Sequence, residues 1–553
     1  MLRAFQAATL GRKYLFLWIG IVPFLFASQL FANDELIEKG QEIFQRQWVH
    51  QPPGISEQGE QSRFEFERHL RSLPGDGLGP MHNATSCEAC HAAGGGAGVD
   101  RNVTLLTLDP RTEFVTKQAT QREVREALLD LFPGLLSPFG VLSMDVVVHE
   151  KSTRPFYDGI RNRIAQHIPG GAPEQWFTSS QRTVDAIAQQ PVLAGRLGSF
   201  DFYLSQRNSP PLYGLGAIDN IPVAHLTKIA RSQPGRTGGA ISGRLGAGKF
   251  GWRGQTATLD QFVRGACAGE LGLQVAGTPQ PADLADETYV SLGADLQEGE
   301  VNMLVSYVRS LPKPIQETRL PRDAVELREG KRLMAKIGCT GCHVETVARV
   351  RGIYSDLLLH DMGELLQAPS PAPLGRDLIS IPRMSLPRFP PDQRPFGSGF
   401  SIGGYYGTPS NAIPYPYPMA RPAEPRFPRD EIPKEPASER PGLVTWDMLQ
   451  REWRTPPLWG VADSAPYLHD GRAATLDAAI RWHGGEASAS ATAYRTLTRE
   501  GRAKVIAFLA SLRAPIQANR QQVDRTVEPV FATTDPENDL QAIAETRSVF
   551  DFE

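Results

Sequence analysis

Four of the five cysteines occur in two Cys-x-x-Cys-His pentapeptides, which end at His91 and His343. In such a unit, two thiols about one helical turn apart can add to the two vinyl groups of a haem, and the adjacent histidine can bind the iron. A Cys-x-x-Cys pair can also hold zinc. Because a histidine follows both pairs, we predict two covalently attached haems. The predicted attachment residues are Cys87, Cys90, His91, Cys339, Cys342 and His343.

An internal repeat relates two later segments of the chain. Residues 252–260 (WRGQTATLD) can be laid over residues 469–477 (HDGRAATLD), and a helix-like stretch follows each copy. Each copy later closes with a similar apolar helix, over residues 301–311 and 505–512. Two cytochrome c units in tandem are the simplest account of this pattern.

The repeat also predicts that the two haems differ. His483 lies seven residues after Leu476, and the equivalent position in the first copy is Ala266, which cannot bind iron. A six-coordinate iron relays electrons, whereas an open position admits peroxide or dioxygen. We therefore predict a second haem held by His343 and His483, and a first haem whose distal side is built differently. The alternative for His483 is a surface histidine stabilised at a helix end.

An acid or base beside an open haem could move a proton between the two oxygens of a peroxide. Glu270, just after the first-copy helix, is the candidate, and an exposed helix-end glutamate is the alternative. Cys267 could bind the first iron, but a lone cysteine with apolar neighbours is more often an inert core residue. Four histidines remain conditional ligands of the first haem: His82, His149, His167 and His225.

Charge and the N-terminal residues indicate partners and compartment. The chain of 553 residues has a formal charge of −3, which argues against nucleic acid as a partner. Residues 1–32 combine basic residues with an apolar run, as in a cleaved signal peptide, although a retained anchor is the alternative. No later stretch is long and apolar enough to span a bilayer. We expect a periplasmic or secreted protein without stable membrane insertion.

The elements that position these residues are predicted to be mainly helical, without a regular β-sheet. Helical patterns cover residues 34–48, 119–132 and 183–193, and another pattern, over 324–338, leads directly into Cys339. The predicted fold is mostly α, with two tandem cytochrome c-like units and long irregular insertions. The predicted divisions are a signal peptide (1–32), a first unit (33–320), a second unit (321–515) with a proline-rich insertion over about 367–442, and a polar tail (516–553).

Four longer motifs closely resemble the di-haem oxidoreductase family, whose members are often labelled thiol oxidoreductases or peroxidases. The motifs are residues 79–91 (GPMHNATSCEACH), 354–363 (YSDLLLHDMG), 452–460 (EWRTPPLWG) and 467–487, which includes YLHDGR and WHGGEA. The resemblance runs from about residue 36 to 513. This family is related to bacterial di-haem cytochrome c peroxidases, to MauG-type enzymes and, more distantly, to di-haem rubber oxygenases.

The resemblance implies roles for further residues. It places His483 where the peroxidases have a methionine ligand and MauG a tyrosine, which implies a lower potential than methionine would give. It places Trp252 between the haems as an electron relay, with a plain core aromatic as the alternative. It places Gln261 and Glu270 at the peroxide site, although the Pro-x-Glu-Met flank of the peroxidases is absent here. It also implies that Arg472 binds a haem propionate, with His360 and His469 near propionates or in loop packing.

From these residues and the resemblance we predict a peroxidase-type enzyme. Electrons would enter at the C-terminal haem and pass through Trp252 to the haem at His91, where peroxide is reduced with Glu270 moving the proton. The expected oxidant is hydrogen peroxide or dioxygen, and the expected electron donor is a small cytochrome or cupredoxin. Two alternatives stay open: an oxygenase that uses dioxygen on an organic or polymeric substrate, and a non-enzymatic electron carrier with both irons six-coordinate.

Overall fold

The computed structural model describes most of the chain between residues 34 and 515. The described ranges are 34–50, 75–109, 129–135, 145–171, 182–317, 321–370 and 446–515, with a few single residues and short gaps beside or inside them. The predicted signal peptide, nearly all of the proline-rich insertion, the tail and most of the helix predicted over 119–132 lie outside the described residues.

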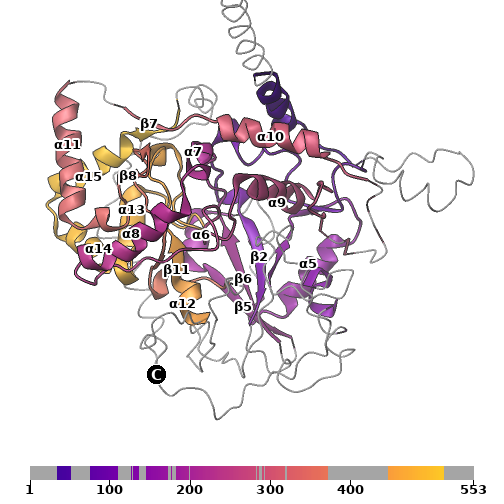
Figure 1. Cartoon of the computed structure of the whole chain (residues 1–553). Coiled ribbons are helices and arrows are strands. Elements are labelled where there is room, and N and C mark those ends of the chain that lie inside the picture. Colours follow the sequence, from indigo (N-terminus) through magenta and orange to yellow (C-terminus); the bar gives the residue numbers. More distant parts are fainter. Residues whose placement is uncertain are drawn as a thin grey trace, which may run out of the picture.

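Helix α9 carries Gln261 and Glu270, whereas most other positions predicted to do chemistry lie in turns and loops next to helices. Several two- or three-residue strands join the loops between the helices (Figure 1). The helices are one over residues 34–45, then α5 (Tyr157–Gln166), α6 (Val184–Gln189), α7 (Leu215–Asp219), α8 (Val223–Arg236), α9 (Leu259–Leu271), α10 (Glu298–Ser310), α11 (Pro321–Lys336), α12 (Trp446–Arg451), α13 (Leu476–Arg481), α14 (Ser488–Thr496) and α15 (Arg499–Ala510). The short strands are β1 (Met81–His82), β4 (Lys151–Ser152), β7 (Ile315–Gln316), β8 (Thr346–Val347), β9 (Val350–Arg351), β10 (Leu359–Asp361), β11 (Glu452–Arg454) and β12 (Leu512–Arg513).

The two copies of the sequence repeat adopt the same local structure. Helices α9 and α13 each begin after a threonine whose hydroxyl accepts the backbone N–H three residues later, at 3.2 and 3.1 Å. In each helix an aspartate of the first turn pairs with an arginine four residues on. An antiparallel bridge also precedes each helix, between Phe250 and Thr256 and between Tyr467 and Ala473. These matches place Ala266 and His483 at equivalent positions.

The helices that close each copy also cross an earlier helix in the same way. The helix over 34–45 crosses α10, and α11 crosses α15. A Cβ added at Gly40 would lie 2.1 Å from the carbonyl oxygen of Met303, and one at Gly330 would lie 2.0 Å from that of Lys504. Since any side chain would clash with this backbone, glycine is required at both crossings.

The expectation that the chain has no regular β-sheet was wrong. Strands β2 (Val103–Leu108), β3 (Asp145–Val148), β5 (Val192–Leu197) and β6 (Phe200–Arg207) form an antiparallel sheet in the order β3-β2-β6-β5. The helix predicted over 183–193 is only α6, and the chain then turns into β5. Branched and leucine side chains in short runs fit a strand whose two faces are both buried, and such runs lack the polar alternation that marks a half-exposed strand.

The sheet separates a core of its own from the first Cys-x-x-Cys-His unit. Leu106 and Leu108 pack with Phe202 and Trp176 on one face of β2. On the other face, Val103 and Leu105 pack with Val147 and face a cavity. In Figure 1 the sheet lies below α9 with α5 at its side, whereas α11, α13, α14 and α15 gather at the left of the view.

Among the described residues, no helix combines the length and the apolar character that crossing a membrane requires.

Candidate haem sites

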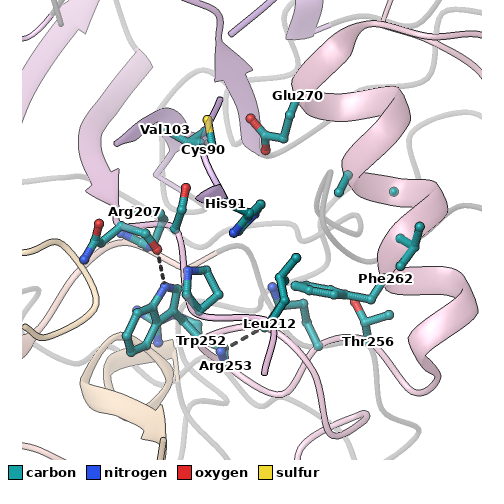
Figure 2. Close-up of a pocket in the computed structure, with 18 of the residues that line it drawn as sticks. Cys90, His91, Val103, Arg207, Leu212, Trp252, Arg253, Thr256, Phe262 and Glu270 are labelled. Atoms are coloured by element: carbon teal, nitrogen blue, oxygen red, sulfur yellow. Dashed lines mark hydrogen bonds between the residues drawn. The ribbon is translucent and has the colours of Figure 1, made fainter. Parts of the chain in front are cut away.

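Each Cys-x-x-Cys-His unit lines one of two large cavities. The first cavity, of about 260 Å³, contains Cys87, Cys90 and His91 and is closed on one side by α9 (Figure 2). The second, also of about 260 Å³, contains Cys339, Cys342 and His343 and is closed by α13 and α15. Both cavities are bounded mostly by apolar side chains, which is the environment that a large flat hydrophobic cofactor needs.

The histidine of each unit is held as a neutral imidazole. The Nδ1 atom of His91 lies 3.0 Å from the carbonyl oxygen of Gly95, and that of His343 lies 2.9 Å from the carbonyl oxygen of Tyr354. Burial lowers the pKa of His91, and burial lowers the pKa of His343 to about 4. A ring that donates from Nδ1 to a carbonyl presents Nε2 as the metal-binding atom, so both residues fit an iron ligand.

His483 faces His343 across the second cavity. Its Nδ1 lies 2.7 Å from the carbonyl oxygen of Ala479, and burial lowers the pKa of His483, so this ring also presents a neutral Nε2. The two ring centroids are 6.5 Å apart. Two metal–nitrogen bonds of about 2 Å each, added to the two ring radii, span nearly this separation. The pair therefore fits an iron held from both sides.

The cysteine thiols are protonated near neutral pH. Burial raises the pKa of Cys90 to about 12 and that of Cys339 to about 11. A hydrogen bond with Cys267, together with burial, raises the pKa of Cys87. Among the described residues, each cysteine pair shares its cavity with its own histidine and not with a second Cys-x-x-Cys pair, so thioether attachment fits the pairs better than a four-cysteine zinc site. Cys267 therefore lies against Cys87, in the wall of the first cavity.

The first cavity has no histidine opposite His91 among the described residues. Ala266, Gln261 and Glu270 line this side, all from α9. The Oε2 atom of Glu270 accepts a hydrogen bond of 2.6 Å from the side chain of Asn83. Figure 2 shows the Glu270 carboxylate directed into the space that His91 also enters. The arrangement leaves space opposite the His91 ring and places the Glu270 carboxylate beside that space.

Carboxylates distinguish the two cavities. Four of them line the first cavity: Asp145, Glu150, Glu270 and Glu452. No aspartate or glutamate is among the described residues that line the second. Among the described residues, carboxylates are therefore concentrated at the cavity that lacks a second histidine.

The four conditional histidines line neither cavity. His82 and His149 are buried behind the first site, where they face the carbonyl oxygens of Gly79 and Gly269 at 3.3 and 2.8 Å. Burial lowers the pKa of both rings to about 4. These histidines are packed as neutral core residues.

Residues 440–512 match the model of a family described as "Di-haem oxidoreductase, putative peroxidase". The resemblance to the di-haem oxidoreductases is thereby confirmed. The matched segment contains His483 and the whole second copy of the repeat.

Two solved structures are similar over part of the chain. One is hydrazine synthase of Kuenenia stuttgartiensis pressurised with xenon, at 18% identity and a TM-score of 0.28, covering 56% of this chain and 73% of that one. The other is a MauG-like protein associated with microbial copper homeostasis, at 17% identity and a TM-score of 0.20, covering 42% of this chain and 59% of that one. No curated protein matches the chain.

Trp252 lines both cavities. Its indole Nε1 donates a hydrogen bond of 2.8 Å to the carbonyl oxygen of Asn208, which also lines both cavities (Figure 2). The tryptophan therefore stands in the wall that the two sites share. Phe262 is the other described aromatic residue that lines both cavities.

Arg472, predicted to bind a propionate, lines neither cavity. It is buried, and its guanidinium donates to Asp470 and to the carbonyl oxygen of Leu365, both at 2.7 Å. Other arginines line the cavities instead: Arg101, Arg207, Arg244 and Arg253 the first, and Arg454 the second. The Nε atom of Arg253 is buried without a partner among the described residues. These cations suit haem propionates better than Arg472 does.

Sequence reasoning missed three of the residues that shape these sites. Asn83, Arg454 and Glu486 all lie inside the motifs that carry the family resemblance. Asn83 and Arg454 are neither iron ligands nor acids, and the partner of Glu486 lies in a distant motif, so nothing in the motifs assigned the three a role. Membership in a motif was the only available signal.

Proposed function

We propose that the protein is a periplasmic or secreted di-haem c-type cytochrome that reduces hydrogen peroxide at the site of His91. Electrons from a small cytochrome or cupredoxin would enter at the site of His343 and His483. The observation that carries the proposal is that Ala266, inside α9, occupies the repeat position of His483, which lies two residues after the end of α13. One site is built to hold an iron from both sides, and the other leaves space for a small oxidant.

The first haem, when bound, supplies an iron at which peroxide takes up two electrons and two protons and leaves as two waters. The chain's own residues provide the proton chemistry. Glu270 can take a proton from one peroxide oxygen and return it to the other, and the 2.6 Å bond from Asn83 fixes the carboxylate in place. Gln261 lines the same wall and can orient the oxidant by hydrogen bonding.

Trp252 is proposed to carry electrons between the sites. Its ring lines both cavities, and a hydrogen bond to the carbonyl oxygen of Asn208 fixes it in place. A rigid aromatic shared by two apolar walls shortens the gap that an electron must cross. We further propose that the matched elements form two cytochrome c units, over residues 33–320 and 321–515.

A dioxygen-dependent oxygenase is the second candidate. The apolar wall of β2, through Val103 and Leu105, gives the first cavity a surface on which an organic substrate could rest. A stable complex with dioxygen and no turnover of peroxide would favour this candidate.

The decisive experiment combines a haem count with electron paramagnetic resonance of the oxidised protein. Two haems per chain, with one high-spin and one low-spin ferric signal, are expected. Hydrogen peroxide should then oxidise a reduced small cytochrome, tested with the protein as isolated and after half-reduction. If neither form turns over peroxide, the peroxidase assignment fails, and two low-spin signals in both forms would favour a simple electron carrier.

A further inference from the structure

Two motifs that lie more than a hundred residues apart in the sequence meet beside the second cavity. His360, from the motif over 354–363, is buried with 2% of its surface exposed. Its Nδ1 lies 2.7 Å from a carboxylate oxygen of Glu486, three residues after His483, and its Nε2 lies 2.9 Å from a carboxylate oxygen of Asp356. Neither His360 nor Glu486 is among the proposed iron ligands, so their pairing needs another explanation.

Charge stabilises the triad formed by Asp356, His360 and Glu486. Burial alone would lower the pKa of His360, but hydrogen bonds with the carboxylates of Asp356 and Glu486 outweigh it and raise the pKa well above its usual value. The ring is therefore an imidazolium that donates to two carboxylates. Charge-assisted hydrogen bonds of this kind are roughly twice as strong as neutral ones, and removing one partner leaves a buried charge uncompensated.

The triad joins the two segments that carry the iron ligands. Glu486 also accepts hydrogen bonds of 3.2 Å from the backbone N–H and the hydroxyl of Ser242. At the other end, Gln233 donates to Asp356 and to the carbonyl oxygen of Gly341, both at 2.8 Å. Gly341 lies inside the second Cys-x-x-Cys-His unit. A continuous polar path thus runs from the loop after His483 to the loop before His343.

The backbone beside the triad leaves little freedom. A Cβ added at Gly485 would lie 2.2 Å from the carbonyl oxygen of Asp361, and one at Gly363 would lie 2.7 Å from the backbone nitrogen of Gly485. Gly485 also has a φ of 50°, in the left-handed region that glycine adopts easily. The loop that follows His483 is therefore pressed against the loop that follows His360.

We propose that Glu486 is a positioning residue that locks His483 onto the second haem. Its bonds to His360 and Ser242 fix the loop over 483–487, and this loop sets the distance between the rings of His483 and His343. Without the lock the distal histidine would leave the iron part of the time, and an outside ligand could bind there. The inference rests on the proposed coordination by His343 and His483.

The test compares Glu486→Ala and Glu486→Gln with His483→Ala in the full di-haem protein. His483→Ala should convert the second low-spin ferric signal fully to high spin. Glu486→Ala should convert part of it and should raise the apparent affinity of the reduced second haem for carbon monoxide roughly 10-fold, the equivalent of one charge-assisted hydrogen bond. Glu486→Gln, which keeps an acceptor, should show a smaller rise.

The matched control is Glu500→Gln, which removes an exposed ion pair with Lys504 on α15 and should leave both readouts unchanged. If His483→Ala leaves the low-spin signal intact, the proposed coordination is wrong. If His483→Ala acts but neither Glu486 variant increases carbon monoxide binding, the lock is overturned and the coordination stands. Should Glu486→Ala fail to incorporate haem, Glu486→Gln alone decides, because an unchanged affinity in that variant contradicts the proposal.

Discussion

The two cavities are closed by helices that start with the same cap and the same ion pair, yet they differ at one decisive position. Ala266 in α9 stands where α13 leads into His483. The surroundings differ accordingly, because carboxylates line the first cavity and no described carboxylate lines the second. One helical scaffold can therefore serve two tasks, with the distal residue and the nearby acids deciding which task each site performs.

The largest effect is expected when the first site receives the histidine of the second. Ala266→His should place an imidazole opposite His91, close the open position and lower peroxide turnover by roughly 100-fold or more. Electron paramagnetic resonance should then show two low-spin signals. Ala266→Ser is the control, because serine is close to alanine in size and its hydroxyl is only a weak iron ligand. Full turnover in a protein with two low-spin haems would contradict the open-site interpretation.

Removing the acid should have the next largest effect. Glu270→Gln keeps the shape and can still bond to Asn83 but cannot move a proton, so turnover should fall by about 10²- to 10⁴-fold at unchanged haem content and spin state. Steady-state kinetics with peroxide measures this. Glu150→Gln, in the same cavity wall, is the matched control and should be much milder. Equal losses in both variants would argue for a general effect of cavity charge.

Trp252 tests the connection between the sites. Trp252→Phe keeps an aromatic ring but loses the hydrogen bond to Asn208, so re-reduction of the first haem after peroxide should slow by roughly 10-fold. Stopped-flow spectroscopy separates this step from the reaction with peroxide, which should be unaffected. Trp453→Phe, an aromatic that lines only the second cavity, serves as control. An unchanged re-reduction rate would reduce Trp252 to a packing residue.

Acid should loosen the region behind the first site before the region around His360. Burial lowers the pKa of His82 and His149 to about 4, below the value of about 6.5 expected in the unfolded chain. Their contribution to stability is present above pH 6.5 and is lost as the pH falls toward 4, by up to about 2 kcal/mol per histidine at pH 5. His360 has a raised pKa and keeps its contribution in acid.

Hydrogen exchange followed by mass spectrometry at pH 7 and pH 5 measures the difference. Peptides around His82 and His149 should gain exchange first, and His149→Gln should reduce the pH dependence there. Earlier opening of the peptides around His360 would contradict the assignment.

Local patterns allowed much of the site to be predicted. The two pentapeptides, the repeat and the alignment of His483 with Ala266 involve neighbours in the chain, so spacing alone revealed them. The sheet escaped because its short strands, buried on both faces, have no polar alternation. The bond between Asn83 and Glu270 joins residues 187 positions apart, and no spacing rule reaches that far.

The arginines also show that sequence spacing does not predict contacts between distant segments. Arg472 was favoured because it lies in a motif beside His469, but its partner is Asp470, two residues away. Arg454 lies in a different motif and reaches the second cavity through a strand pairing between β10 and β11. Which cation faces a cofactor depends on the pairing of distant strands.

The absence of carboxylates among the described residues of the second cavity has a consequence for how electrons and protons are coupled. Besides His343 and His483, two described histidines line this cavity, His360 and His469. Neither titrates near neutral pH, because burial holds the pKa of His469 well below its usual value and the carboxylates of Asp356 and Glu486 raise the pKa of His360. The potential of this site should therefore vary little with pH. Proton-coupled reduction is then confined to the first cavity, so the driving force delivered by the relay stays constant while the chemistry it feeds responds to acidity.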